Sequence, residues 1–296
     1  MKKIFCTLLA VALMTTIAFC AVGCTKDISG ALTNEVAQNL LFGQNQAFAL
    51  MDQAVNYTVE YVASQDDSKT AGMATLVLDE TNGVNFVSLY ANSSYIDEGD
   101  QGNSIAYAFL NWEEKKNGSL EKSQVMLSSY TDGVDDLAPV WNEYSDMEMS
   151  GSVGAPVKMH YNTLISNCGA HHGTRYIREE IYNNNKDVFD TVQITGTGHY
   201  NDKEMQDMFK AEVVITYNYV DDNEATVHGK VTVVLDKREI KLVDGRTVDM
   251  LTITSINIAE EGGFNLTANY TYGVNSFEKP TEDNLEEVWP EEYPIA

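Results

Sequence analysis

The chain has few cysteines that could form disulfide bonds. Of its four cysteines, Cys6 and Cys20 lie in the first apolar run and Cys24 follows that run directly. If the run is cut off as a secretory signal and Cys24 is acylated, Cys168 is the free thiol that remains. A disulfide within the mature chain is then excluded. A fold of this length must instead rest on its hydrophobic core.

Positive charge is also scarce. There are 19 Lys and Arg residues against 44 Asp and Glu, for a net charge of −25, and loss of Lys2 and Lys3 with the signal would make it more negative. Binding to nucleic acid needs cations that displace counterions, so this class is excluded, and the charge disfavours adhesion to anionic lipid headgroups. Two interpretations remain: acidity for solubility, or attraction to a cation or a basic partner.

Catalytic and phosphate-binding patterns are missing as well. No Gly-x-Ser-x-Gly occurs, and a Cys168/His171 pair has no third residue to orient the base. Gly196-Thr-Gly198 lacks the third glycine of a phosphate loop and predicts a turn. Asp132–Asp136 and Asp221–Glu224 carry oxygens without calcium-loop spacing, which favours solvated turns. We therefore expect no enzyme activity and no cofactor.

The N-terminus has the pattern of a lipoprotein signal. Lys2 and Lys3 precede an uncharged run from Ile4 to Val22, which ends in Ala21-Val22-Gly23-Cys24. A basic start, an apolar run and small residues before a cut describe a secretory signal. The cysteine after Gly23 predicts cleavage there and a diacylglyceryl group on Cys24. The alternative is a membrane-spanning helix, since the run has about the minimum length of 18–20 residues.

These patterns divide the chain into four parts. Residues 1–23 are the signal, 24–30 a short lipidated tether, 31–279 a single domain, and 280–296 an acidic tail with Pro290 and Pro294. No composition break splits the domain. The predicted location is the extracytoplasmic face of the cell membrane, and we expect a monomer.

Two segments predict helices. Ala31–Ala54 has apolar residues at near-helical spacing, with Thr33 or Asn34 as the N-cap and Gly43 as a possible interruption. Lys203–Phe209 predicts a second, short helix. We expect both helices to cover one face of a sheet.

The rest of the domain alternates between apolar and polar residues, as strands with one wet face do. In the first half the predicted strands are Tyr57–Val62, Ala74–Leu78, Val84–Tyr90, Ser104–Trp112 and Gln124–Tyr130, followed by an acidic loop over Thr131–Val153. In the second half they are Val213–Tyr219, Thr226–Leu235, Glu239–Val243, Val248–Ile258 and Leu266–Tyr272. The predicted class is α+β, with a large, curved antiparallel sheet that forms an open half-barrel.

The order of these elements resembles the LolA/LppX-type lipoproteins, and more closely the lipoproteins of Gram-positive bacteria that share that fold. The segments that carry the resemblance are Lys203–Phe209, Ala211–Leu235 and Tyr270–Thr281. The resemblance implies a half-barrel whose helix-lined concave face receives acyl chains or other apolar ligands. It assigns no ligand residues, and the acidic stretch over 132–148 has no counterpart in it.

One cluster has the composition of a metal site. His160, Cys168, His171 and His172 could supply four zinc ligands. Adjacent histidines fit poorly, because neighbouring strand residues point to opposite faces. The alternative is a glycine-rich loop with solvent-facing histidines and a half-buried Cys168.

Together these patterns predict a non-enzymatic lipoprotein whose sheet holds an apolar, lipid-like molecule near the membrane. The alternative is an acidic surface or scaffold lipoprotein that binds a protein partner or a cation. A metal-dependent role at Cys168, His171 and His172 is a third hypothesis.

Overall fold

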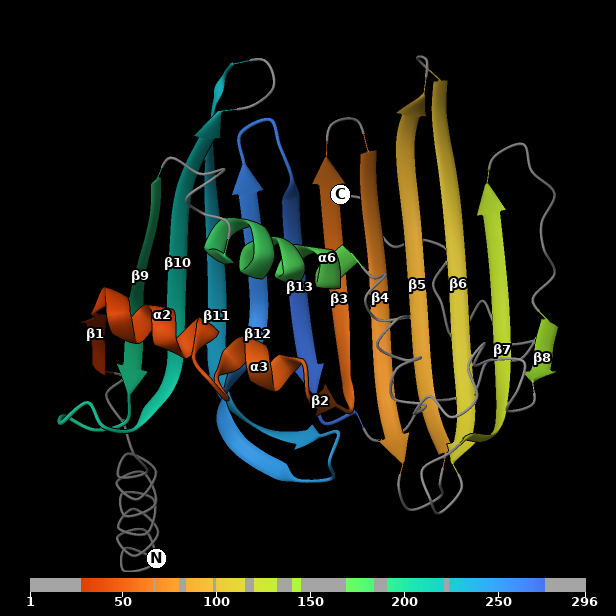
Figure 1. Cartoon of the computed structure of the whole chain (residues 1–296), viewed down its shortest axis with the longest axis horizontal. Helices are drawn as coiled ribbons and strands as arrows, with labels where there is room; N and C mark the ends of the chain where they lie inside the picture. Colours follow the sequence, from red (N-terminus) through yellow and green to blue (C-terminus); the bar gives the residue numbers. More distant parts are fainter. Residues whose placement is uncertain are drawn as a thin grey trace, which may run out of the picture.

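The structure is a computed structural model that describes residues 28–65, 68–79, 84–97, 100–114, 120–131, 140–144, 169–183, 191–220 and 224–274, with side chains excluded over 78–170 and at His172. In these ranges one sheet of thirteen strands dominates (Figure 1). The first-half strands are β1 (Ile28–Leu32), β2 (Ala54–Val55), β3 (Tyr57–Gln65), β4 (Ser68–Asp79), β5 (Val84–Asp97), β6 (Asp100–Glu114), β7 (Leu120–Thr131) and β8 (Val140–Tyr144). The second-half strands are β9 (Thr191–Tyr200), β10 (Met208–Val220), β11 (Thr226–Leu242), β12 (Thr247–Glu260) and β13 (Asn265–Tyr272).

The sheet consists of two antiparallel meanders joined side by side. The strand order is β1-β9-β10-β11-β12-β13-β3-β4-β5-β6-β7-β8, with β2 paired to β11. The junction is β13 with β3, in register from Tyr57 opposite Tyr272 to Ser64 opposite Asn265. β1 and β8 stand at opposite ends of this order, so the described sheet is open. The predicted α+β class with an open antiparallel sheet is confirmed.

Helices cover one face of the C-terminal meander and of β3 (Figure 1). They are α2 (Asn34–Phe42), α3 (Ala47–Met51), α6 (Gly169–Arg175) and the π-helix η1 (Tyr176–Asn183), which continues α6. Alternate residues of β10, namely Ala211, Val213, Ile215 and Tyr217, are at most 1 % exposed, whereas the residues between them are not buried. The apolar side of β10 is thus buried and its other side stays wet, as the alternation predicts.

A β-bulge bends the longest strand pair. The β11–β12 register shifts between Val234 and Leu235, which pair with Ser255 and Ile253, so that Thr254 is the extra residue. The Thr254 hydroxyl donates to Asp236 Oδ2 at 3.0 Å. Bulges increase local twist and bend the strand. The lower ends of β11 and β12 accordingly curve out of the direction of their neighbours (Figure 1).

The prediction for residues 24–54 is partly wrong. Ile28 to Leu32 form strand β1 against β9, so the tether does not extend to residue 30 and the helix does not begin at Ala31. The helix begins at Asn34, with Thr33 as N-cap: its side chain accepts from the Val36 amide at 3.3 Å. The predicted interruption at Gly43 is confirmed, because α2 ends there.

Four further sequence predictions are corrected. Lys203–Phe209 is not a helix; residues 201–207 form the turn from β9 to β10 and β10 begins at Met208, so the mid-chain helix is 169–183 instead. Gly196 and Gly198 are in strand β9, not in a turn. The segments predicted as 226–235 and 239–243 are one strand, β11. Val140–Tyr144 is a strand inside the predicted acidic loop.

The close neighbours of β9 explain why glycine occurs at positions 196 and 198. A Cβ on Gly196 would lie 3.1 Å from Leu32 Cδ1 and 3.2 Å from Ala37 Cβ. The two glycines therefore let β1 and α2 approach β9 closely.

Among the described helices, none is long and apolar enough to cross a membrane.

Candidate functional site

A cleft of about 170 Å³ opens where α2, α3 and η1 meet on the helix-covered side of the sheet. Its lining is apolar and aromatic, with one charged and one amide side chain: Leu41, Phe42, Gly43, Phe48, Ala49, Arg178, Tyr182 and Asn183. Residues from helices more than 100 positions apart in the sequence thus line the same cleft. We take this cleft as the candidate site.

The helix break at Gly43 produces the first half of the wall. The chain leaves α2 at Gly43, passes Asn45 in a left-handed conformation (φ 58°), and re-enters a helix at Ala47. This places the rings of Phe42 and Phe48 5.4 Å apart. In an unbroken helix, residues six apart would point in different directions. The break therefore lets both rings face the same space.

Helix η1 supplies the opposite wall. Ile177 and Ile181 are fully buried against the core, which turns Tyr182 toward α2. Its ring stacks on Phe42 with centroids 3.8 Å apart and an interplanar angle of 2°. The Tyr182 hydroxyl accepts from Gln38 Nε2 at 2.7 Å. An aromatic pair contributes about 0.5–1.5 kcal/mol beyond its area burial, so this contact joins the two helices.

An ion pair stands beside the rings. Arg178 Nη1 lies 2.8 Å from Asp52 Oδ1, with 36 % and 43 % of the side chains exposed. The guanidinium carbon also lies 5.7 Å from the centre of the Phe48 ring. An exposed pair of this kind contributes at most about 1 kcal/mol. Asp52 thus orients Arg178, whose guanidinium stays partly exposed.

The described lining of the cleft is suited to binding a guest. The described residues that line the cleft include no cysteine, serine or histidine, so among them there is no nucleophile with an adjacent base. Apolar walls with few polar groups are typical of small-molecule sites. The arrangement offers an apolar ring or chain a stacking surface and offers an anion one guanidinium.

A second cluster surrounds a buried carboxylate, Glu260, which is 6 % exposed. Its Oε1 accepts from the hydroxyls of Tyr217 at 2.5 Å and Tyr176 at 2.6 Å. Its Oε2 accepts from the Phe264 amide at 3.0 Å and the Tyr219 hydroxyl at 3.3 Å. Four donors satisfy one buried charged group, as burial of a carboxylate requires. The cluster joins η1 to β10 and β12.

The tyrosines of this cluster stay protonated. Burial raises the pKa of both Tyr176 and Tyr217 well above its usual range. The hydrogen bond that each hydroxyl donates to Glu260 and the negative charge of Glu260 add to this effect. In the same core, burial raises the pKa of Tyr272 to about 12. Hydroxyls held neutral act as hydrogen-bond donors and not as general bases. We therefore assign this cluster to stability.

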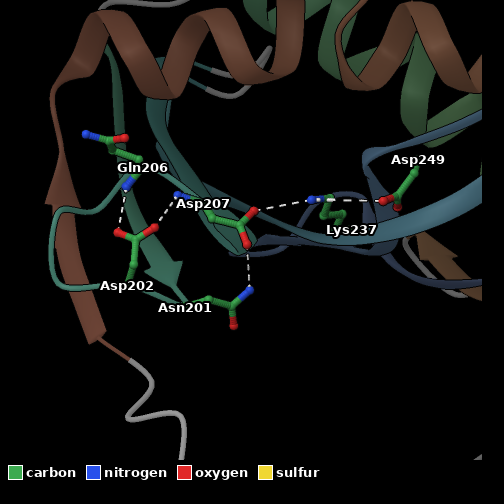
Figure 2. A network of polar contacts seen from close by, with 6 residues as sticks. All are labelled: Asn201, Asp202, Gln206, Asp207, Lys237 and Asp249. Carbon is green, nitrogen blue, oxygen red and sulfur yellow. Dashed lines mark hydrogen bonds and ion pairs between the residues drawn. The ribbon is translucent and has the colours of Figure 1, made fainter.

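A third polar network holds the β9–β10 turn (Figure 2). The Asp202 carboxylate accepts from the backbone amides of Gln206 and Asp207 at 3.0 and 3.1 Å. Hydrogen bonds from Asn201 and then from Lys237 lower the pKa of Asp207. Asp202 thus competes with a helix for these amides, which is the physical reason that the predicted helix over 203–209 does not form.

The proposed zinc ligands are only partly described. His171 lies in helix α6, where its carbonyl accepts from the Thr174 hydroxyl at 2.8 Å, so the loop interpretation is wrong for residues 169–175. His160, Cys168 and the His172 side chain lie outside the described part of the chain. Within that part, no group of three potential ligands could hold a metal ion. The zinc hypothesis stays a prediction.

Sequence reasoning did not find the cleft residues. Gly43 was the available signal, since it marked a helix break, but the partner helix at 176–183 had no recognised pattern. The wide turn of η1 distorts the 3.6-residue spacing on which such recognition depends. The residues Phe42, Phe48, Arg178 and Tyr182 meet only in the fold.

Comparison with known proteins gives limited information. No protein-family model matches the chain, and no curated protein matches it. Among solved structures, one similar chain is the crystal structure of a beta-barrel-like protein of domain of unknown function DUF1849 from Brucella abortus. It has 9 % sequence identity and a TM-score of 0.29, and the alignment covers 74 % of this chain and 98 % of that one. The likeness to the LolA/LppX group therefore remains a resemblance of pattern.

Proposed function

We propose that this protein is a non-enzymatic lipoprotein, anchored by a diacylglyceryl group on Cys24 at the extracytoplasmic face of the membrane. Its role is to hold an apolar, lipid-like molecule on the helix-covered face of its sheet. The observation that carries the binding role is the cleft of about 170 Å³ walled by Phe42, Phe48 and Tyr182.

The size of the cleft limits the part of the guest that it buries. An apolar cavity of about 150 Å³ holds one benzene ring, and whole drug-sized ligands occupy about 300–1,000 Å³. The cleft is therefore suited to one ring or a short stretch of acyl chain. The rest of the molecule would extend past Arg178 and Asn183, both of which are partly or fully exposed.

A substitution that fills the cleft tests the binding role. Ala49 lines the cleft, so Ala49→Trp should occupy the space of the guest. We expect about tenfold weaker binding of a fluorescent fatty acid, equal to about 1.4 kcal/mol. The titration uses the chain without residues 1–24, which keeps every described residue.

The matched control is Ala259→Trp, which adds the same ring to the exposed face of β12. It should bind the probe as the unsubstituted chain does. Equal binding by both variants, or a chain that binds no probe, contradicts the proposal. Binding that instead disappears as salt is raised favours the acidic interaction protein.

A further inference from the structure

The strand register places the predicted lipid attachment at one end of the sheet. Ile28, the first residue of β1, pairs with Tyr200, the last residue of β9. Cys24 precedes Ile28 by four residues and therefore lies within about 14 Å of it, since a chain spans at most about 3.5 Å per residue. The β9–β10 turn over 201–207 begins at this same end (Figure 1).

Two contacts join the 201–207 turn to its neighbours at this end. Met205, in a left-handed conformation (φ 56°), covers Gly30 of β1 so closely that a Cβ there would lie 2.1 Å from Met205 Cε. Lys237 of β11 reaches Asp207 of the turn at 3.2 Å and Asp249 of β12 at 3.9 Å (Figure 2). The turn, β1 and the curved β11–β12 pair thus form one surface, which we call the entry end.

The entry end carries cations, although its carboxylates outnumber them. Besides Lys237, Arg238 pairs with Asp236 at 3.7 Å and Arg246 pairs with Asp244 at 2.7 Å. Lys203 is exposed in the 201–207 turn. A basic residue near an anionic bilayer contributes about 1 kcal/mol of attraction. The cations here offset part of the negative charge of this end.

The described residues at the opposite end of the sheet are mainly acidic: they include Asp97, Asp100, Glu224 and Glu261, with Lys69 as a cation. The thirteen residues of β10 separate the two ends by about 44 Å at about 3.4 Å per residue. Salt screens electrostatic interactions beyond about 8–10 Å. Only the end of the sheet that faces the membrane therefore interacts with the charge of the headgroups.

We propose that the entry end, formed by the 201–207 turn, β1 and the β11–β12 turn over 243–246, faces and contacts the bilayer surface, with the acidic end directed away from it. The strands then stand upright on the membrane. This orientation rests on the proposed function, because it requires the lipid on Cys24.

Depth-dependent quenching tests the orientation. The mature lipidated protein, which begins at Cys24 and carries Cys168→Ser, is given one new thiol by Lys203→Cys at the entry end or by the matched Glu261→Cys at the acidic end. Each variant is labelled with a fluorophore and reconstituted into phosphatidylcholine–phosphatidylglycerol vesicles that carry nitroxide headgroups. The label at 203 should lose most of its fluorescence, and the label at 261, about 40 Å away along the strands, should keep it.

Vesicle flotation separates the two proposals, and circular dichroism checks that both variants fold. Protein that floats with the vesicles but shows equal quenching, or stronger quenching at 261, overturns the orientation and leaves the lipid anchor intact. Protein that is absent from the floating fraction overturns the anchor and with it the orientation.

A second pair of labelled variants, Gln44→Cys and Asn257→Cys, detects a sheet that lies flat on the membrane. Gln44 lies in the α2–α3 connection on the helix-covered side, and Asn257 lies on the wet side. Preferential quenching of either member overturns the upright arrangement.

Discussion

Glu260 illustrates how one residue combines burial with charge. It ends strand β12, where alternation directs it to the core side, and it is followed by the Gly262-Gly263 turn. A Cβ on Gly229 would lie 2.2 Å from Tyr217 Cζ, so the absent side chain leaves room for the ring that donates to Glu260. The cost of burying the carboxylate is thus offset by neighbours from three elements.

We expect Glu260→Gln to lower the free energy of unfolding by about 2 kcal/mol, because hydrogen bonds to a charged group contribute about 1.5–3 kcal/mol. The amide retains the shape but replaces one acceptor oxygen by a donor. Urea unfolding measures the difference. Glu261→Gln, which changes the adjacent exposed carboxylate, should shift it by less than about 0.5 kcal/mol; equal effects would contradict a specific role of Glu260.

The helical elements depend on close approach to the sheet. Helix α6 crosses β13 and β3 at Gly173, where a Cβ would lie 2.0 Å from Leu266 Cδ2 and 3.5 Å from Ile258 Cδ1. Both of these side chains are 1 % exposed and have little space to move. Glycine thus serves packing here, although it disfavours the helix itself.

We expect Gly173→Ala to destabilise the protein by about 1–3 kcal/mol, the usual effect of overpacking a core, in spite of the better helix propensity of alanine. Thermal unfolding followed by circular dichroism measures it. Glu179→Ala serves as the control on the same helical rod, because it removes only the exposed Arg175–Glu179 pair, worth about 0.5 kcal/mol or less. A stabilised Gly173→Ala variant would show that the helix is free to shift outward.

At the scale of the whole molecule, the sheet joins two sequence-separated meanders through β13 and β3. The helices cover the C-terminal meander and β3, and the cleft lies among them. The anchor and the binding role are separate proposals. Loss of the lipid should leave the cleft unchanged, since Cys24 precedes the described residues.

We expect Cys24→Ser to abolish incorporation of a labelled fatty acid into the protein in bacterial cells and to shift it from the lipid-modified to the precursor form on a gel. The hydroxyl of serine is not a substrate for thioether formation, which is the reason for the loss. Val22→Ser, next to the predicted cut but not the acylated residue, is the control and should keep the label. Label retained by Cys24→Ser would contradict lipidation at Cys24.

Much of the fold could be predicted because strand alternation is a local signal. Strands β10 to β13 follow from period-two patterns, although β11 was predicted as two strands. Thr33 and Gly43 bound α2 as their capping and breaking tendencies predict. The errors have local causes too. Asp202 captures the amides of a weak helix, and β9 looked like a turn because its two glycines accommodate neighbours from β1 and α2.

The sequence by itself determined the one-sided antiparallel sheet, the acidity and the lipid-attachment motif at Cys24, because each depends on residue type and short-range spacing. The tertiary structure alone decided that β1 begins only four residues after Cys24 and pairs with β9, which gives the molecule an entry end. It also brought Phe42 and Tyr182 into a stack across 140 residues of sequence. Contacts of this range depend on how meanders and helices pack together, and no local period records that packing.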